Sequence, residues 1–139
     1  MSDSAAPLAV TDTHALVWAI GDQRKRLGKR AKRLFDRADD HEGAIYIPTF
    51  ALVELGETCR KGHVTLNLPF SEWIRVAFSS GKYHEAPLTA EIVCVAQGLY
   101  DIPERGDRLI AATAVAMDLP LITRDSEIAE IAGVECIWS

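Results

Sequence analysis

The chain has 139 residues, of which 48% are hydrophobic and 25% are charged, and its formal net charge is −5 at pH 7. This length suits one domain, and this composition is ordinary for a globular protein. Because no apolar stretch approaches the roughly 20 residues of a membrane-spanning helix, and the first residues lack the basic and apolar parts of a signal peptide, we expect a cytoplasmic protein without a membrane partner.

Residues 1–7 are expected to form a flexible N-terminus, and residues 8–139 a single domain of alternating strands and helices. In chain order, the hydrophobic pattern predicts a strand over 8–11, helices over 13–20 and 29–40, a strand over 44–47, and helices over 50–61 and 70–78. It then predicts a strand over 83–87, a helix from 90 to 99, a loop over 100–106, a helix over 107–116, a strand over 121–123, a helix over 126–132 and a strand over 134–138. Thr49 and Thr89 are predicted N-caps. Strands separated by helices indicate an α/β fold with a parallel sheet covered on both faces.

The cysteines and histidines do not indicate a zinc site or a disulfide. Cys59, Cys94 and Cys136 are odd in number, far apart and without a CxxC pair, and the four histidines are isolated. We expect reduced, partly buried thiols.

Basic residues are concentrated in one segment of this acidic chain. Eight of the fifteen lysines and arginines lie between Arg24 and Arg37. Such a segment is commonly a solvated helix face, and its functional alternative is a track for RNA phosphates or a dock for an acidic partner. The candidate contact residues are Arg24, Lys25, Arg26, Lys29, Arg30 and Arg33.

Four carboxylates stand at positions that a parallel sheet would bring together. Asp12, Glu54 and Asp125 each follow a predicted strand, and Asp107 opens a predicted helix. Ligands of open parallel sheets gather outside the carboxyl ends of the strands, so these side chains can converge there. Carboxylates that lie so close together repel one another, and a hard cation such as Mg²⁺ or Mn²⁺ offsets that repulsion.

Each acid also has a simpler explanation. Asp12, Asp107 and Asp125 stand where aspartate caps helices, and Glu54 suits a solvated rim. Capping and metal binding are compatible, because one carboxylate has two oxygens. Considered together, the four acids favour a metal-dependent hydrolase that acts on phosphate esters.

Several neighbouring side chains are accessory candidates. Thr13, Thr123 and Glu104 lie close enough in sequence to contact the carboxylates or a metal, and Arg108 and Arg124 could hold a phosphate or pair with an acid. The hydroxyls are equally explained as cap or turn residues.

Four motifs in order resemble those of PIN domains, and most closely those of the VapC-type toxins of toxin–antitoxin pairs. They are VTDTHALVW at 10–18, PTFALVEL at 48–55, DRLIAATA at 107–114 and LITRD at 121–125. The resemblance covers residues 8–138.

This resemblance implies a PIN-like α/β/α sandwich around a central, mostly parallel sheet of about four to five strands. It also implies a Mg²⁺- or Mn²⁺-dependent endoribonuclease that cleaves RNA with a metal-bound water, forms a homodimer and is inhibited by a cognate antitoxin. The catalytic and metal-binding acids of the family would be Asp12, Glu54, Asp107 and Asp125, with Thr13 and Thr123 less secure accessory matches.

Two departures from the family pattern bear on the ligand count. Many relatives read Asp-Pro-x-Asp-Arg before the small-residue helix, whereas this chain reads ERGDR at 104–108, so Glu104 is the candidate for an additional acid. The serine common at the start of the Glu54 motif is Thr49 here, which keeps the hydroxyl.

Three alternatives remain open at this point. A HAD-type phosphatase would need a second acid at the position of His14. A receiver-type signalling domain would need adjacent acids after the first strand. A PIN-like module that only binds, with idle acids, is compatible with the sequence.

Overall fold

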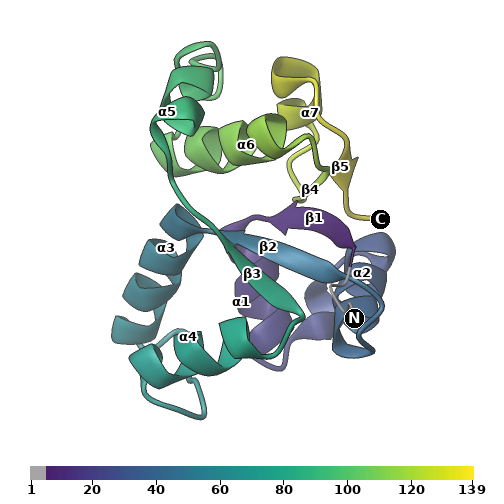
Figure 1. The fold of residues 1–139 in the computed structure, drawn as a ribbon, viewed down its shortest axis with the longest axis vertical. Coiled ribbons are helices and arrows are strands. Elements are labelled where there is room, and N and C mark those ends of the chain that lie inside the picture. The colour runs from purple at the N-terminus through teal and green to yellow at the C-terminus, as the bar shows by residue number, and fades with distance from the viewer. Residues whose placement is uncertain (1–5) are drawn as a thin grey trace.

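The computed structural model describes residues 6–139 as a five-stranded sheet enclosed by helices (Figure 1). The strands are β1 (Pro7–Thr11), β2 (Ala44–Pro48), β3 (Tyr83–Ala86), β4 (Leu121–Ile122) and β5 (Cys136–Ile137). The helices are α1 (Thr13–Ile20), α2 (Lys29–Asp39), α3 (Thr49–Arg60), α4 (Phe70–Ser79), α5 (Ala90–Gln97), α6 (Arg105–Met117) and α7 (Glu127–Ala132), with a short 3₁₀ turn η1 (Arg24–Arg26).

The strands lie in the order β3-β2-β1-β4-β5, and every neighbouring pair is parallel. This confirms the expected parallel α/β sheet. β1 is central, with Val10 paired to Tyr46 of β2 and to Leu121 of β4. The chain builds outward from β1 first through β2 and β3 and later through β4 and β5, so the strand order reverses between β1 and β4. Open α/β sheets bind their ligands at such a reversal.

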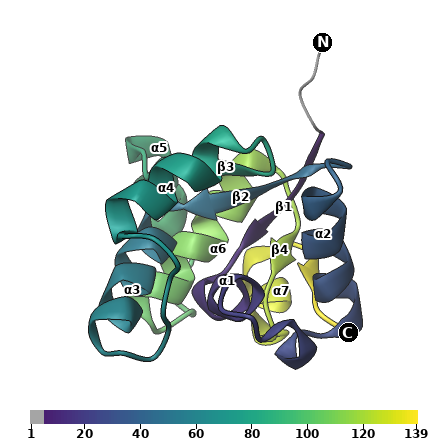
Figure 2. The ribbon, with the colours of Figure 1, turned by 90° about the horizontal axis from the view of Figure 1, so that it is seen from below.

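The helices cover the two faces of this sheet. In Figure 1, α5, α6 and α7 lie above the sheet, and α1, α3 and α4 lie below it. Figure 2 shows the molecule from below, with α1 between α3 and α2. The two layers meet where α3 contacts α6, and α6 also contacts β1.

Apolar side chains of the strands fill the space between these layers. Val10, Ile45, Ile47, Leu121 and Ile122 are fully buried. Strands covered on both faces are expected to be apolar throughout rather than alternating. The short sequences AIYIP of β2 and LI of β4 fit that pattern.

Two helix starts differ from the prediction. Thr49 is not an N-cap but the first residue of α3, and its hydroxyl hydrogen-bonds across to β3 at Glu85 and Ala86. α6 begins at Arg105 rather than at Asp107, because the side chain of Glu104 caps it by accepting the Asp107 N–H at 2.7 Å. The predicted cap at Thr89 is confirmed, since its hydroxyl accepts the Ile92 N–H.

The remaining predicted elements are present with small changes at their ends. β5 is shorter than the predicted strand over 134–138, and η1 was not predicted. Most of the expected flexible segment 1–7 falls outside the described residues, and Pro7 already belongs to β1. Among residues 6–139 no helix is long and apolar enough to cross a membrane.

The cysteines form no disulfide with one another. All three are free thiols; Cys59 and Cys136 are partly buried as expected, whereas Cys94 is exposed on α5.

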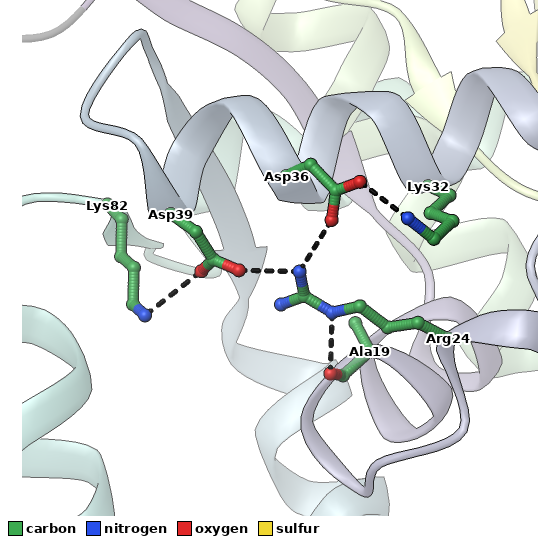
Figure 3. A network of polar contacts seen from close by, with 6 residues as sticks. All are labelled: Ala19, Arg24, Lys32, Asp36, Asp39 and Lys82. Carbon is green, nitrogen blue, oxygen red and sulfur yellow. Dashed lines mark hydrogen bonds and ion pairs between the residues drawn. The ribbon is translucent and has the colours of Figure 1, made fainter.

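An ion-pair network fastens η1 and α2 to the rest of the lower layer (Figure 3). The guanidinium of Arg24 donates to Asp36 at 2.9 Å, to Asp39 at 2.5 Å and to the Ala19 carbonyl at the end of α1. Lys82, at the start of β3, pairs with the other oxygen of Asp39 at 3.0 Å. The network therefore joins α1, η1, α2 and β3.

Candidate active site

Two of the four predicted acids follow neighbouring strands. Asp12 comes directly after β1, and its backbone N–H donates to the Ile122 carbonyl of β4 at 3.0 Å. Its carboxylate accepts the Ala15 N–H at 2.8 Å and so caps α1. Asp125 follows β4 and accepts the Glu127 N–H at 3.1 Å, at the start of α7. Capping explains part of what both aspartates do, and one carboxylate oxygen of each is left for another role.

The other two acids lie where α3 approaches α6. Glu54 of α3 accepts a hydrogen bond of 2.5 Å from the Thr13 hydroxyl of α1. A Cβ placed on Gly106 of α6 would lie 3.0 Å from a Glu54 oxygen and 3.1 Å from a Glu104 oxygen. Glycine at 106 therefore lets the two glutamates approach the first turn of α6, in which Asp107 stands.

Two adjoining cavities collect these side chains. The larger cavity, of about 550 Å³, is lined by Asp12, Glu54, Glu104 and Asp107 among others. The smaller cavity, of about 250 Å³, is lined by Asp12, Asp107 and Asp125. Asp12 and Asp107 line both, so all four predicted acids border one continuous acidic cleft at the reversal of strand order.

The electrostatics of the cleft confirm that these acids influence one another. Burial, together with the charges of Glu104, Asp12, Glu54 and Asp125, raises the pKa of Asp107 to about 6. Burial also raises the pKa of Asp12, although the Ala15 N–H, the Thr123 hydroxyl and the charges of His14 and Arg124 oppose that shift. The ionised forms of these carboxylates are thus destabilised in the cleft, and a bound cation would stabilise them.

The donors suit a hard cation by type but do not converge on a single point. An oxygen-only set matches Mg²⁺ or Mn²⁺. Within residues 6–139, however, no three histidines, cysteines, aspartates or glutamates are arranged so that they could hold one ion. Glu54 is turned toward Thr13, and Glu104 toward the Asp107 N–H. Both glutamates would have to rotate before they could ligate a metal beside Asp12 and Asp107.

The accessory candidates divide into residues at the cleft and residues engaged elsewhere. Thr13 and Thr123 line the larger and the smaller cavity, respectively. Arg108 does not line either cavity, because its guanidinium donates to the Ile102 and Pro103 carbonyls and lies 4.0 Å from the centre of the Tyr100 ring. The contact of Arg108 with a phosphate or an acid of the site therefore stays a prediction that would require its side chain to move.

The basic segment likewise contributes little to the cleft. Arg24 is held in the ion-pair network, and Arg30 pairs with Glu135 at 3.0 Å. Lys25, Lys29 and Arg33 are exposed and line neither cavity of the cleft. Of the six candidates, Arg26 alone lines the larger cavity.

Sequence reasoning missed several side chains that border the acids. Trp18 lines both cavities, and the larger one also includes Lys61 and His63. Lys61 lies seven residues after Glu54, a spacing that places both on one face of a helix. That spacing is the signal that could have identified Lys61, whereas Trp18 resembles an ordinary core residue in the sequence.

Comparisons with known proteins agree with this geometry. The family model of the PIN domain matches residues 9–134. No curated protein sequence matches the chain.

Solved structures of toxin–antitoxin proteins share the fold. A structure of VapBC2 from Rickettsia felis bound to a DNA fragment from their promoter aligns with a TM-score of 0.67 and 18% identity, over 94% of this chain and 98% of that chain. A toxin–antitoxin complex from Klebsiella pneumoniae aligns with a TM-score of 0.59 and 21% identity, over 87% and 89%. FitAcB from Neisseria gonorrhoeae aligns with a TM-score of 0.58 and 19% identity, over 92% and 95%.

Proposed function

The chain belongs to the PIN-domain family, and from that premise we propose that it is a Mg²⁺- or Mn²⁺-dependent endoribonuclease, the toxin of a type II toxin–antitoxin pair. The observation that carries the proposal is that Asp12, Glu54, Asp107 and Asp125 between them line two adjoining cavities at the reversal of strand order. Acidic clefts of this kind serve phosphoryl chemistry when they hold a divalent ion.

Each acid has a role in this proposal. Asp12, Asp107 and Asp125 border the smaller cavity and would hold the ion, and Glu54 would join them from the larger cavity. A bound Mg²⁺ or Mn²⁺ supplies a Lewis acid and lowers the pKa of a bound water.

The protein groups around these acids orient them. Thr13 donates to Glu54 at 2.5 Å, and Thr123 lies beside Asp12. The Ala15 N–H fixes one oxygen of Asp12, which leaves the other to face the cleft. Glu104 caps α6 and stands close enough to contribute a further oxygen.

The partners follow from the same premise. Of the similar structures described above, the one from Klebsiella pneumoniae is, by its name, a toxin–antitoxin complex, and VapBC2 from Rickettsia felis is bound to a DNA fragment from their promoter. We propose an antitoxin partner, a homodimer and cytoplasmic residence, within one domain over residues 8–139. Light scattering of the purified protein tests the dimer through its mass.

The decisive experiment compares the purified protein with its Asp12→Asn variant on a mixed RNA pool, with Mn²⁺ and with EDTA. We expect cleavage in Mn²⁺ only, and a fall of about a hundredfold or more in the variant, because the metal loses a ligand charge. Asp118→Asn is the matched control, since Asp118 lies at the opposite end of α6 with a left-handed backbone that asparagine accepts. Equal cleavage by the Asp12→Asn variant and the unchanged protein would remove the nuclease proposal.

The alternatives differ in what they predict. A receiver-type domain is expected to have a flavodoxin-like strand order of 2-1-3-4-5, and the observed order is β3-β2-β1-β4-β5. Membership of the PIN-domain family also argues against the alternative of a HAD-type phosphatase. A module that only binds would leave RNA intact in the experiment above while still forming a complex with its partner.

A further inference from the structure

An RNA strand that enters the cleft meets an electrostatic obstacle. Asp12, Glu54, Asp107 and Asp125 repel the phosphates of the substrate as well as one another. Positive side chains near the acids must therefore attract the backbone and hold it against that repulsion. The candidates are the lysines and arginines that line the cleft.

Three basic side chains meet that condition, and they differ in how they are held. Arg26 and Lys61 line the larger cavity, and Arg124 lines the smaller one. Within residues 6–139 none of them is in an ion pair, in contrast to Arg24 and Arg30. Lys61 follows the last residue of α3, and its ammonium has no ion pair or cation–π contact in the part of the chain that the structure describes.

The two arginines, by contrast, are both placed over one aromatic ring. The central guanidinium carbon of Arg26 lies 4.6 Å from the centre of the Trp18 ring, and that of Arg124 lies 5.4 Å from it. Trp18 itself is buried and packs against Trp138 at 6.0 Å between ring centres. It is therefore a rigid platform that lies between the two cavities.

The cation–π contacts with Trp18 use none of the N–H donors of either guanidinium. A cation–π contact uses the face of the planar group, whereas its five N–H donors point outward in the plane and match phosphate oxygens in pairs. Within the described chain, the only hydrogen bond of the Arg26 side chain is a 3.2 Å contact with the Gln23 side chain. Arg24, two residues earlier, anchors η1 in the ion-pair network (Figure 3), which limits the positions open to Arg26.

We propose that Arg26 and Arg124, stacked on Trp18, bind the phosphates on the two sides of the scissile bond, one in each cavity beside Asp12 and Asp107. The proposal rests on the proposed ribonuclease function and deepens it, since it identifies the side chains that position the substrate. The arginines hold the backbone; the chemistry stays with the acids.

The test measures RNA binding separately from cleavage. A fluorescein-labelled single-stranded RNA is titrated with the Asp12→Asn protein in Mg²⁺, and Arg26→Ala, Arg26→Lys and Arg124→Ala are added to that background. We expect each alanine variant to bind roughly threefold to tenfold more weakly and to lower the slope of log affinity against log salt by about 0.7, the contribution of one phosphate contact to a single strand. Arg26→Lys should keep the slope but lose part of the affinity, because lysine keeps the charge without the planar fork.

Arg75→Ala is the matched control. Arg75 is exposed on α4 and lines neither cavity of the cleft, so its loss should leave affinity and slope unchanged. Circular dichroism melts check that Arg26 and Arg124, both exposed, can be replaced without unfolding.

The outcomes separate this inference from the proposed function. Alanine variants that bind as the background does, or whose affinity falls no further than that of Arg75→Ala, would overturn the inference, as would an Asp12→Asn protein that binds no RNA. Metal-dependent cleavage by the unchanged protein would still support the nuclease in those cases. The opposite outcome is that both arginine variants bind RNA more weakly but the unchanged protein does not cleave it. This result would support the phosphate contacts and reject the proposal that the protein is a nuclease.

Discussion

The carboxyl group of Asp107 lies within electrostatic reach of four other acids, and this sets how the site responds to pH. Its pKa in the folded protein is raised to about 6, from an ordinary value of 3.8. The folded state therefore favours the neutral form. The stabilising contribution of that protonated form is complete below about pH 4 and is lost as the pH rises through about 6.

Asp107→Asn is expected to stabilise the metal-free protein at pH 7.5 by an amount on the order of 1 kcal/mol, because asparagine removes a charge that the neighbouring acids repel. The partial exposure of Asp107 keeps the figure below the full value of the pKa shift. Urea unfolding in EDTA at pH 7.5 and pH 4 measures it, and the gain should shrink at the lower pH. A variant that is less stable at pH 7.5 would show that Asp107 is not under repulsion.

Single residues of the cleft differ in how well the sequence predicted them. Asp12 and Asp125 were predictable because each follows an apolar strand, and their position there depends only on local order. The sequence alone could not show that Arg26 lines the cleft and that Arg108 does not. Contacts with Tyr100 and two backbone carbonyls hold the Arg108 side chain away from the cleft, whereas the contact with Trp18 holds Arg26 beside it. Both positions depend on tertiary contacts.

Among the elements, η1 and α2 depend on charged contacts as well as apolar ones. Burial raises the pKa of Asp39, but hydrogen bonds and charges from Arg24 and Lys82 outweigh it, so that the pKa is lowered overall. A lowered pKa contributes stability above the ordinary value near 4, and that stability is lost as the pH falls below it.

We therefore expect Asp39→Asn to lower the free energy of unfolding at pH 7 by about 1 kcal/mol, a discounted value for a partly exposed pair. The difference from the unchanged protein should fade as the pH falls below 3.8 and through the lowered pKa of Asp39 in the folded protein. Asp40→Asn serves as the control, because Asp40 is the exposed neighbour and forms no ion pair within residues 6–139. Equal stability of the two variants at pH 7 would contradict a structural role for the network.

At this scale the sequence predicted most helices and strands but misplaced the start of α6. Gly106 suggested a loop, and glutamate is an uncommon N-cap, so the Glu104 cap could not be recognised. The turn η1 has no hydrophobic periodicity, and it is held by Arg24 contacts with residues 12 and 15 positions away.

At the scale of the whole molecule, we expect cation binding to raise the stability of the folded protein. A ligand that binds only the folded state stabilises it in proportion to the logarithm of its saturation, by about 2.7 kcal/mol at a hundred times the dissociation constant. We expect saturating Mn²⁺ to raise the melting temperature by roughly 5–10 °C, and Asp12→Asn to abolish most of that rise. Differential scanning fluorimetry with and without Mn²⁺ measures it, and an equal rise in the variant would place the cation elsewhere.

The global arrangement could be predicted only in part. Alternating strands and helices predicted a parallel sheet, but they do not determine strand order, and the cleft exists because β1 lies beside β4. The same arrangement brings Glu54 and Gly106 together through α3 and α6. Those contacts join residues more than fifty positions apart, beyond the reach of local patterns.

The central strand β1 is synthesised before the other four strands, but it gains its second neighbour only later. β1 obtains its neighbour β4 only when residues 121–122 have emerged, and Asp125 follows them. A nascent or prematurely terminated chain that stops before this point leaves one edge of β1 open to other strands. It also lacks one of the four proposed acids, so a fragment of this chain is expected to be prone to aggregation and harmless to RNA.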